Sequence, residues 1–94
     1  MRNIVILPSF ERSLKKLSPF EKKQAAESLE AFNSMLISGH FPAGLGFKKI
    51  NHDKYELRAS IRLRVVIKAE GDSYYLVFIG GHDQVKRYLR NYRG

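Results

Sequence analysis

The sequence predicts a single α+β domain in which helices cover one face of an antiparallel sheet. Three observations support this prediction. A chain of 94 residues with 44% apolar side chains has room for one hydrophobic core. A capped helix begins in the first half, and apolar and basic residues alternate in the second half. We therefore expect residues 1–94 to form one domain with the order β-α-α-β-β-β-α and a helical hairpin packed on one face of the sheet.

The first half predicts a strand followed by the helical hairpin. Residues 3–7 are rich in β-branched side chains and end at Pro8. The next apolar residues recur at helical spacing, which indicates a short helix: Phe10, Leu14 and Leu17. A longer helix should begin after Ser18, which can cap it while Glu21 completes a capping box. Gly39 is a natural C-terminal stop.

The second half predicts the sheet. A loop-like stretch at 39–53 contains a short strand at 47–50, and residues 55–69 then alternate with period two. One parity is apolar, and Val66 is the only apolar residue of the other, mainly basic parity. Because fifteen residues are long for one strand, we expect a three-residue turn at 59–61. That turn would set Arg58 opposite Arg62, and Glu56 opposite Arg64.

The last quarter predicts a hairpin and a final helix. Residues 70–72 form a turn, residues 73–79 form a central strand, and Gly80-Gly81 ends it. Asp83 can cap the helix that follows. Its apolar stripe comprises Val85, Tyr88, Leu89 and Tyr92.

The net charge of +8 is distributed unevenly. Residues 1–46 hold six basic and four acidic side chains, whereas residues 47–94 hold eleven and five. This surplus favours a polyanion, and RNA is the partner we expect, although a merely solvated basic surface is the alternative. The chain has no cysteine, and no segment has the length and apolar character of a signal peptide or membrane span. We therefore expect a soluble cytoplasmic protein without a membrane partner or a cofactor.

The sheet face left uncovered is the main candidate site. Alternation places Arg58, Arg62 and Arg64 there, and arginines in a cluster repel one another unless an anion binds among them. Lysines of the preceding loop extend this phosphate-binding face: Lys48, Lys49 and Lys54. The wet side of the final helix adds Lys86, Arg87 and Arg90. The hypothesis depends on the three arginines standing together, and a solvated face with Glu–Arg pairs is its alternative.

His82 lies just past the last strand, at the rim of this face. Histidine titrates near neutral pH, so His82 is a candidate proton donor, and a surface histidine beside a helix cap is the alternative. Tyr88 has core packing as its default role, but an aromatic ring near the site could stack on a base. The dyads His52-Asp53 and His82-Asp83 lack further ligands, so we expect no metal site.

These segments resemble the RelE/ParE superfamily of toxins from type II toxin–antitoxin modules. The resemblance rests on the order and spacing of Lys49-Ile50, Tyr55-Glu56-Leu57-Arg58, Ile61-Arg62-Leu63 and Gly81-His82-Asp83 with Arg87-Tyr88. The last segment is most similar to the RelE- and YafQ-like branch. The connection between Arg58 and Arg62 is shorter than is usual in the family and lacks its common glycine.

The resemblance implies a ribosome-dependent, metal-independent endoribonuclease that cuts mRNA in the 30S decoding site. In this reaction the ribose 2′-hydroxyl attacks the adjacent phosphate, and an acidic antitoxin neutralises the toxin. The resemblance further implies that Arg62 holds the scissile phosphate and that His82 is the catalytic histidine. Arg58, Lys49 and Tyr88 would complete the catalytic set.

Three other functions remain open from the sequence. A ParE-like gyrase poison would share the fold but need neither His82 nor the clustered arginines. A non-catalytic RNA-binding module, such as a degenerate double-stranded RNA-binding domain, would bind without cutting. An inactive toxin relic would still bind its antitoxin but would have no activity of its own.

Overall fold

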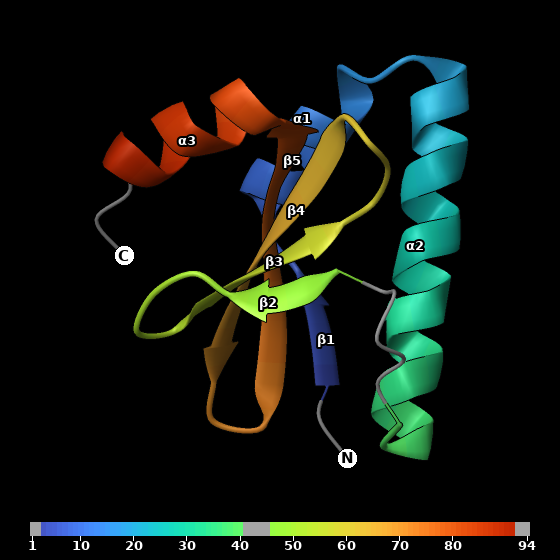
Figure 1. Ribbon diagram of the computed structural model, residues 1–94, viewed down its shortest axis with the longest axis vertical. Coiled ribbons are helices and arrows are strands. Elements are labelled where there is room, and N and C mark those ends of the chain that lie inside the picture. Colours follow the sequence, from blue (N-terminus) through green and yellow to red (C-terminus); the bar gives the residue numbers. More distant parts are fainter. Residues whose placement is uncertain (1–2, 41–45, 92–94) are drawn as a thin grey trace.

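The computed structural model describes residues 3–40 and 46–91, which form three helices and a five-stranded sheet (Figure 1). The elements are β1 (Asn3–Ile6), α1 (Pro8–Lys15), α2 (Pro19–Ser38), β2 (Phe47–Lys49), β3 (Lys54–Arg58), β4 (Leu63–Glu70), β5 (Ser73–Gly81) and α3 (His82–Asn91). The α+β class is confirmed. The alternating run at 55–69 contributes to two strands, so four strands follow the helical pair. Two predicted features lie outside the described residues: part of the loop at 39–53, and Tyr92.

The sheet has the order β1-β5-β4-β3-β2 and is mixed, whereas we expected it to be antiparallel. β1 runs parallel to β5, with Asn3 beside Ser73 and Ile6 beside Leu76. All the other strand pairs are antiparallel. A strand presents the same alternation of faces in either direction. The direction of β1 therefore could not be predicted from its residues.

The ends of α2 form as the sequence predicts. The Ser18 hydroxyl accepts from the Glu21 amide at 3.2 Å, and the Glu21 carboxylate accepts from the Ser18 amide at 2.9 Å. Gly39 closes the helix with a φ of 76° and donates to the Met35 carbonyl. Both contacts satisfy backbone groups that the helix itself leaves unpaired.

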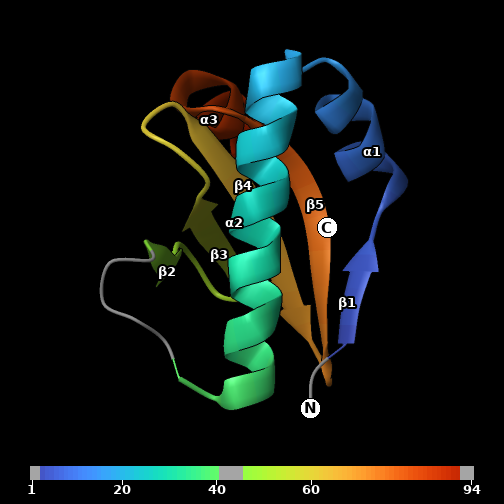
Figure 2. The same ribbon diagram turned by 90° about the vertical axis from the view of Figure 1, so that its right-hand side faces the viewer.

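The main core lies between the sheet and the pair α1–α2. In Figure 2, α2 passes in front of the sheet and α1 lies beside β1. The core contains fully buried side chains from both layers, among them Phe10, Phe32, Leu57, Val65 and Ile67. These strand residues all have the odd parity, so the apolar half of the predicted alternation does face the core.

The second face of the sheet is covered in part by α3, so the prediction of one uncovered face is wrong. Val66 and Val77 are fully buried and pack with Val85 of α3. α2 and α3 consequently lie on opposite sides of the sheet (Figure 1). Val66, the apolar exception on the basic parity, belongs to this second cluster.

The start of α3 also differs from the prediction. β5 continues through Gly80 and Gly81, which pair with Arg64 and Leu63. A Cβ atom on Gly80 would lie 2.9 Å from Oε1 of Gln84 and 3.0 Å from the Phe78 ring. Gly80 is thus required for close packing of α3 on the strand. Asp83 lies inside the first turn, and Gln84 makes the capping contact by accepting from the Gly81 amide at 2.8 Å.

Candidate nucleic-acid site

The connection between β3 and β4 carries Arg62 at its end. The Ser60 hydroxyl accepts from the amides of Arg62 at 3.2 Å and Leu63 at 3.0 Å. The Ala59 amide donates to the Leu63 carbonyl at 3.0 Å. Residues 59–62 therefore form a hydrogen-bonded turn that is one residue longer than predicted. As a result Arg58 pairs with Arg64 and Glu56 with Val66, so the predicted register is wrong.

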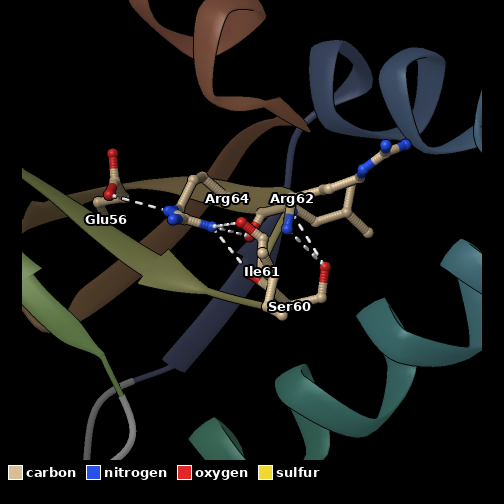
Figure 3. A network of polar contacts seen from close by, with 6 residues as sticks. Glu56, Ser60, Ile61, Arg62 and Arg64 are labelled. Carbon is tan, nitrogen blue, oxygen red and sulfur yellow. Dashed lines mark hydrogen bonds and ion pairs between the residues drawn. The ribbon is translucent and has the colours of Figure 1, made fainter.

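The side chain of Arg64 stabilises this turn by hydrogen bonds to its backbone. Its Nη1 donates to the carbonyls of Ser60 at 2.8 Å, Ile61 at 3.1 Å and Leu63 at 3.1 Å. Its Nε lies 3.5 Å from a carboxylate oxygen of Glu56, and both side chains are largely buried. We call this network the Arg64 brace (Figure 3). It uses one guanidinium to satisfy three carbonyls and one carboxylate.

The three arginines consequently do not stand together on one open face, and that expectation is wrong. Figure 3 shows the Arg64 side chain directed toward Glu56 and the Arg62 side chain directed the opposite way, toward α1. Arg62 is exposed in the turn, and Arg58 is exposed at the end of β3. Since Arg64 is already paired, it belongs to the scaffold of the site.

A cleft of about 490 Å³ lies where Arg62 points, and we call it the basic cleft. Its walls come from α1, the adjoining ends of β4 and β5, and α3, with Glu21 at the start of α2. The cations that line it are Arg12, Lys16 and Arg62. None of the three forms an ion pair within the described part of the chain. Glu21, the only acidic residue of its lining, is held by the capping box.

The opposite wall of the basic cleft is pre-organised by α3 and β5. The ring of Tyr88 stacks on Phe78 with centroids 4.4 Å apart and planes 13° from parallel. Gln84 is fixed by its capping contact to Gly81. On the α1 side, the Ser13 hydroxyl accepts from the Ile79 amide at 3.0 Å. These contacts hold part of the cleft's lining in place before any ligand binds.

His82 is exposed at the first position of α3 and does not line the basic cleft. Gly81 and Gln84, which precede and follow the pair His82-Asp83, do line it. His82 therefore lies at the rim of the basic cleft, whereas the sequence placed it at the rim of an arginine-lined sheet face that does not form.

The other predicted cations are dispersed. Lys48 and Lys49 are exposed on the edge strand β2, opposite Glu56 and Tyr55, so they point to different faces of the sheet. The basic residues of α3 are exposed on its outer side: Lys86, Arg87 and Arg90. Lys54 is only 8% exposed and lies 3.1 Å from the Asp53 carboxylate, which assigns it to the fold.

The surroundings of Asp53 lower the pKa of its carboxyl group. The hydrogen bond from Lys54 is the main cause of its lowered pKa, and the charges of Lys54 and Lys68 act in the same direction, against partial desolvation. Lys68 lies 4.0 Å from Asp53 and 3.2 Å from Glu70. These pairs lie on β3 and β4, outside the lining of the basic cleft.

Arg12 and Lys16 are not among the site residues that the sequence predicts. They lie four residues apart at the end of α1, and the spacing i, i+4 places them on one face of the helix. The signal in the sequence is this basic pair opposite the apolar stripe, which by itself predicts only that the helix packs on the core.

Among residues 3–40 and 46–91, no group of three or more metal-ligating side chains is close enough to hold an ion. None of the helices there has the length and apolar character to cross a membrane.

Comparison with known proteins identifies the fold. No protein-family model and no curated protein matches the chain. A chain of the RelB–RelE antitoxin–toxin complex from Methanococcus jannaschii superposes with a TM-score of 0.69 at 20% identity, covering 89% of this chain and 96% of that one. YafQ from Escherichia coli BL21(DE3) gives 0.65 at 13% identity, with 90% and 98% covered. The YoeB dimer from Staphylococcus aureus gives 0.63 at 20% identity, with 86% and 97% covered.

The chain therefore has the fold of RelE-like toxins, and the resemblance seen in the sequence is confirmed at the level of fold. A fold by itself does not determine an activity, which must be argued from the site.

Proposed function

We propose that this protein is the toxin of a type II toxin–antitoxin module and a ribosome-dependent mRNA endonuclease of the RelE/YafQ-like branch. It acts in the cytoplasm without a metal, and an acidic antitoxin is its neutralising partner. One observation carries the proposal beyond the fold. Arg12, Lys16 and Arg62, which form no ion pair among residues 3–40 and 46–91, line one cleft whose other walls are held by internal contacts.

The proposed reaction is an internal transfer at phosphorus. The 2′-oxygen attacks the adjacent phosphate, and the bond from phosphorus to the 5′-oxygen breaks. A cyclic 2′,3′-phosphate and a 5′-hydroxyl result. The 2′-hydroxyl loses its proton to a base, and the leaving oxygen gains one from an acid. Negative charge accumulates on the phosphate in the transition state, where fixed guanidinium groups stabilise it.

The role that we propose for each residue follows from its position relative to the basic cleft. Arg62 is held on the braced turn and contacts the scissile phosphate, while Arg12 and Lys16 contact its non-bridging oxygens or the next phosphate. His82 at the rim donates the proton to the 5′-oxygen. Tyr88, already stacked on Phe78, presents an aromatic edge to the bound nucleotide.

The other exposed cations that the sequence singled out contact RNA phosphates outside the basic cleft. They are Arg58, Lys48, Lys49, Lys86, Arg87 and Arg90. Arg64 and Lys54 are assigned to the scaffold because each already has a carboxylate partner.

The test is a brief induction of the protein in bacterial cells, with mapping of new RNA 5′ ends. We expect cuts within translated codons and growth arrest. Arg62→Ala should lower the cleavage rate by about 10²–10³-fold, as removal of a transition-state donor does. Lys23→Ala, an exposed lysine of α2 that lines no part of the basic cleft, is the matched control.

Two outcomes would contradict the proposal. A fully toxic Arg62→Ala protein would show that Arg62 is not the phosphate ligand. Growth arrest with inhibited DNA supercoiling and intact mRNA would show that the protein acts as a gyrase poison instead.

A further inference from the structure

A second cleft adjoins Arg62 on the side away from the basic cleft's other cations. It measures about 470 Å³ and lies between the start of α2 and the β3–β4 turn. We call it the apolar cleft, and its lining residues are Ser18, Phe20, Glu21, Gln24, Ser60, Ile61 and Arg62. Arg62 is the only cation in this lining. Glu21 is its only acidic residue and is already held by the capping box.

Two large apolar side chains of this cleft are left in water. Phe20 is 68% exposed and Ile61 is 91% exposed, and neither belongs to a core cluster. They come from different elements, the first turn of α2 and the tip of the β3–β4 turn. The fold gains little from either side chain, because the apolar area that each removes from water is small.

Gln24 supplies an unused polar group in the same cleft. Gln24 is half-buried, and its side chain forms no hydrogen bond within residues 3–40 and 46–91. An amide of this kind can donate and accept hydrogen bonds at the edge of a base. An aromatic ring, an aliphatic side chain, an amide and a cation therefore surround one space.

We propose that the apolar cleft binds a nucleobase of the same RNA strand whose phosphate lies in the basic cleft. Single-stranded RNA is recognised by aromatic side chains on which bases stack and by cations that follow its backbone. Arg62 lines both clefts, so a phosphate on one side of it and a base on the other belong to one or to neighbouring nucleotides. Phe20 stacks on the base, Ile61 covers its other side and Gln24 contacts its edge.

Charge alone would also admit an acidic protein segment, and the flat apolar space beside Phe20 and Ile61 is what favours a nucleotide as the occupant. The two clefts together present Arg12, Lys16 and Arg62 against Glu21 alone. A ligand that fills both must be anionic at one end and flat and apolar at the other, and a nucleotide has both properties. Figure 3 shows the turn that carries Ser60 and Arg62 lying across from α2, as the shared cleft requires.

This inference rests on the proposed function, and its test separates the two. Full-length protein is titrated with short 2′-O-methyl RNA, which cannot undergo the cleavage, and binding is followed by fluorescence anisotropy. A second series of oligonucleotides carries one abasic site at each position in turn. Phe20→Ala should weaken binding about 5- to 100-fold, the range for loss of one base–aromatic stack.

Three controls accompany the titration. Phe20→Tyr should retain the affinity, since the ring persists. Ile37→Ser changes an exposed apolar residue of α2 that lines neither cleft, and this variant should bind as the wild type does. An abasic site at one position should weaken wild-type binding and abolish the difference between wild type and Phe20→Ala.

The outcomes discriminate clearly. If Phe20→Ala and every abasic oligonucleotide bind normally while Arg62→Ala binds weakly, the nucleobase site is wrong and the phosphate site stands. If none of these changes alters RNA binding, both proposals fail. If Phe20→Ala binds RNA normally but escapes neutralisation by a protein antitoxin, the cleft is a protein-docking surface and the inference is overturned.

Discussion

The basic side chains of this protein fall into two groups when each is considered as a single residue. Lys54, Arg64 and Lys68 have carboxylate partners within 4.0 Å. Arg12 and Arg62 line a cleft without such a partner in the described part of the chain. A paired cation stabilises the fold, whereas an unpaired one is available to a phosphate. The sequence presents both groups alike, because pairing depends on which strands become neighbours.

Asp53 yields a prediction about acid stability. Its pKa is lower in the folded protein than the ordinary value of 3.8, chiefly because Lys54 donates a hydrogen bond to it. A carboxyl with a depressed folded pKa stabilises the fold above the unfolded value, and the contribution is lost as the pH falls through the folded value. Asp53→Asn should therefore be less stable than wild type at neutral pH.

The measurement is urea unfolding from pH 7 to pH 2. The difference between wild type and Asp53→Asn should shrink once the pH falls below about 4, where the unfolded carboxyl becomes protonated. A difference that stays constant across this range would mean that the Asp53–Lys54 pair does not contribute through its charge.

His82 yields a prediction about the chemical step. If His82 donates a proton to the leaving oxygen, it should affect the rate of the chemical step more than the affinity for the ribosome. His82→Ala should slow single-turnover cleavage on the ribosome by about 10²–10⁴-fold and change ribosome affinity little. Lys86→Ala, at an exposed position of the same helix, should show the reverse pattern. Equal losses of rate and affinity in His82→Ala would remove its proposed acid role.

Among the secondary-structure elements, the β3–β4 turn has the greatest influence on the site. Four carbonyl or carboxylate groups share one guanidinium in the Arg64 brace, and the same turn carries Arg62 outward. Lysine offers a compact ammonium in place of a planar fork and cannot reproduce this geometry. Arg64 therefore acts as a positioning residue for Arg62.

Arg64→Lys should lower the free energy of unfolding by about 1–3 kcal/mol, since it leaves carbonyl groups of the turn without their charged donor. Glu56→Gln should cost less, because the three carbonyl contacts persist. Hydrogen exchange at the amides of Arg62 and Leu63 should accelerate in Arg64→Lys and much less in Glu56→Gln. Unchanged exchange in Arg64→Lys would show that the Ser60 contacts alone hold the turn.

Local signals predicted the elements well and their contacts less well. The capping box at Ser18 and Glu21 was readable because all of its atoms lie within four residues. The length of the β3–β4 turn could not be predicted in this way, because it depends on Arg64 contacting backbone carbonyls on the turn. The sequence predicts that Gly80 ends the strand. In the structure, Gly80 allows the side chains of Gln84 and Phe78 to lie close to its backbone. Val66 was the one available sign that a helix would cover the second face.

At the scale of the whole molecule, the candidate site lies at the rim of the sheet and not on one of its faces, where the sequence predicted it. Helices lie on both sides of the sheet, and the basic cleft lies at the edge where α1, α3 and the β3–β4 turn meet. Charge acts at this scale as well. The net charge of +8 favours polyanions in general, whereas in the proposed function the cations of the basic cleft determine where a phosphate is held.

Salt dependence separates these two effects. For single-stranded nucleic acid, the slope of log affinity against log salt concentration is about −0.7 for each phosphate contact. Arg62→Ala and Lys16→Ala should each make the slope shallower by about 0.7, because each removes one such contact. Lys23→Ala removes the same formal charge outside the cleft and should leave the slope nearly unchanged. Equal slopes for all three variants would mean that RNA responds only to the net charge and that the cleft holds no particular phosphate.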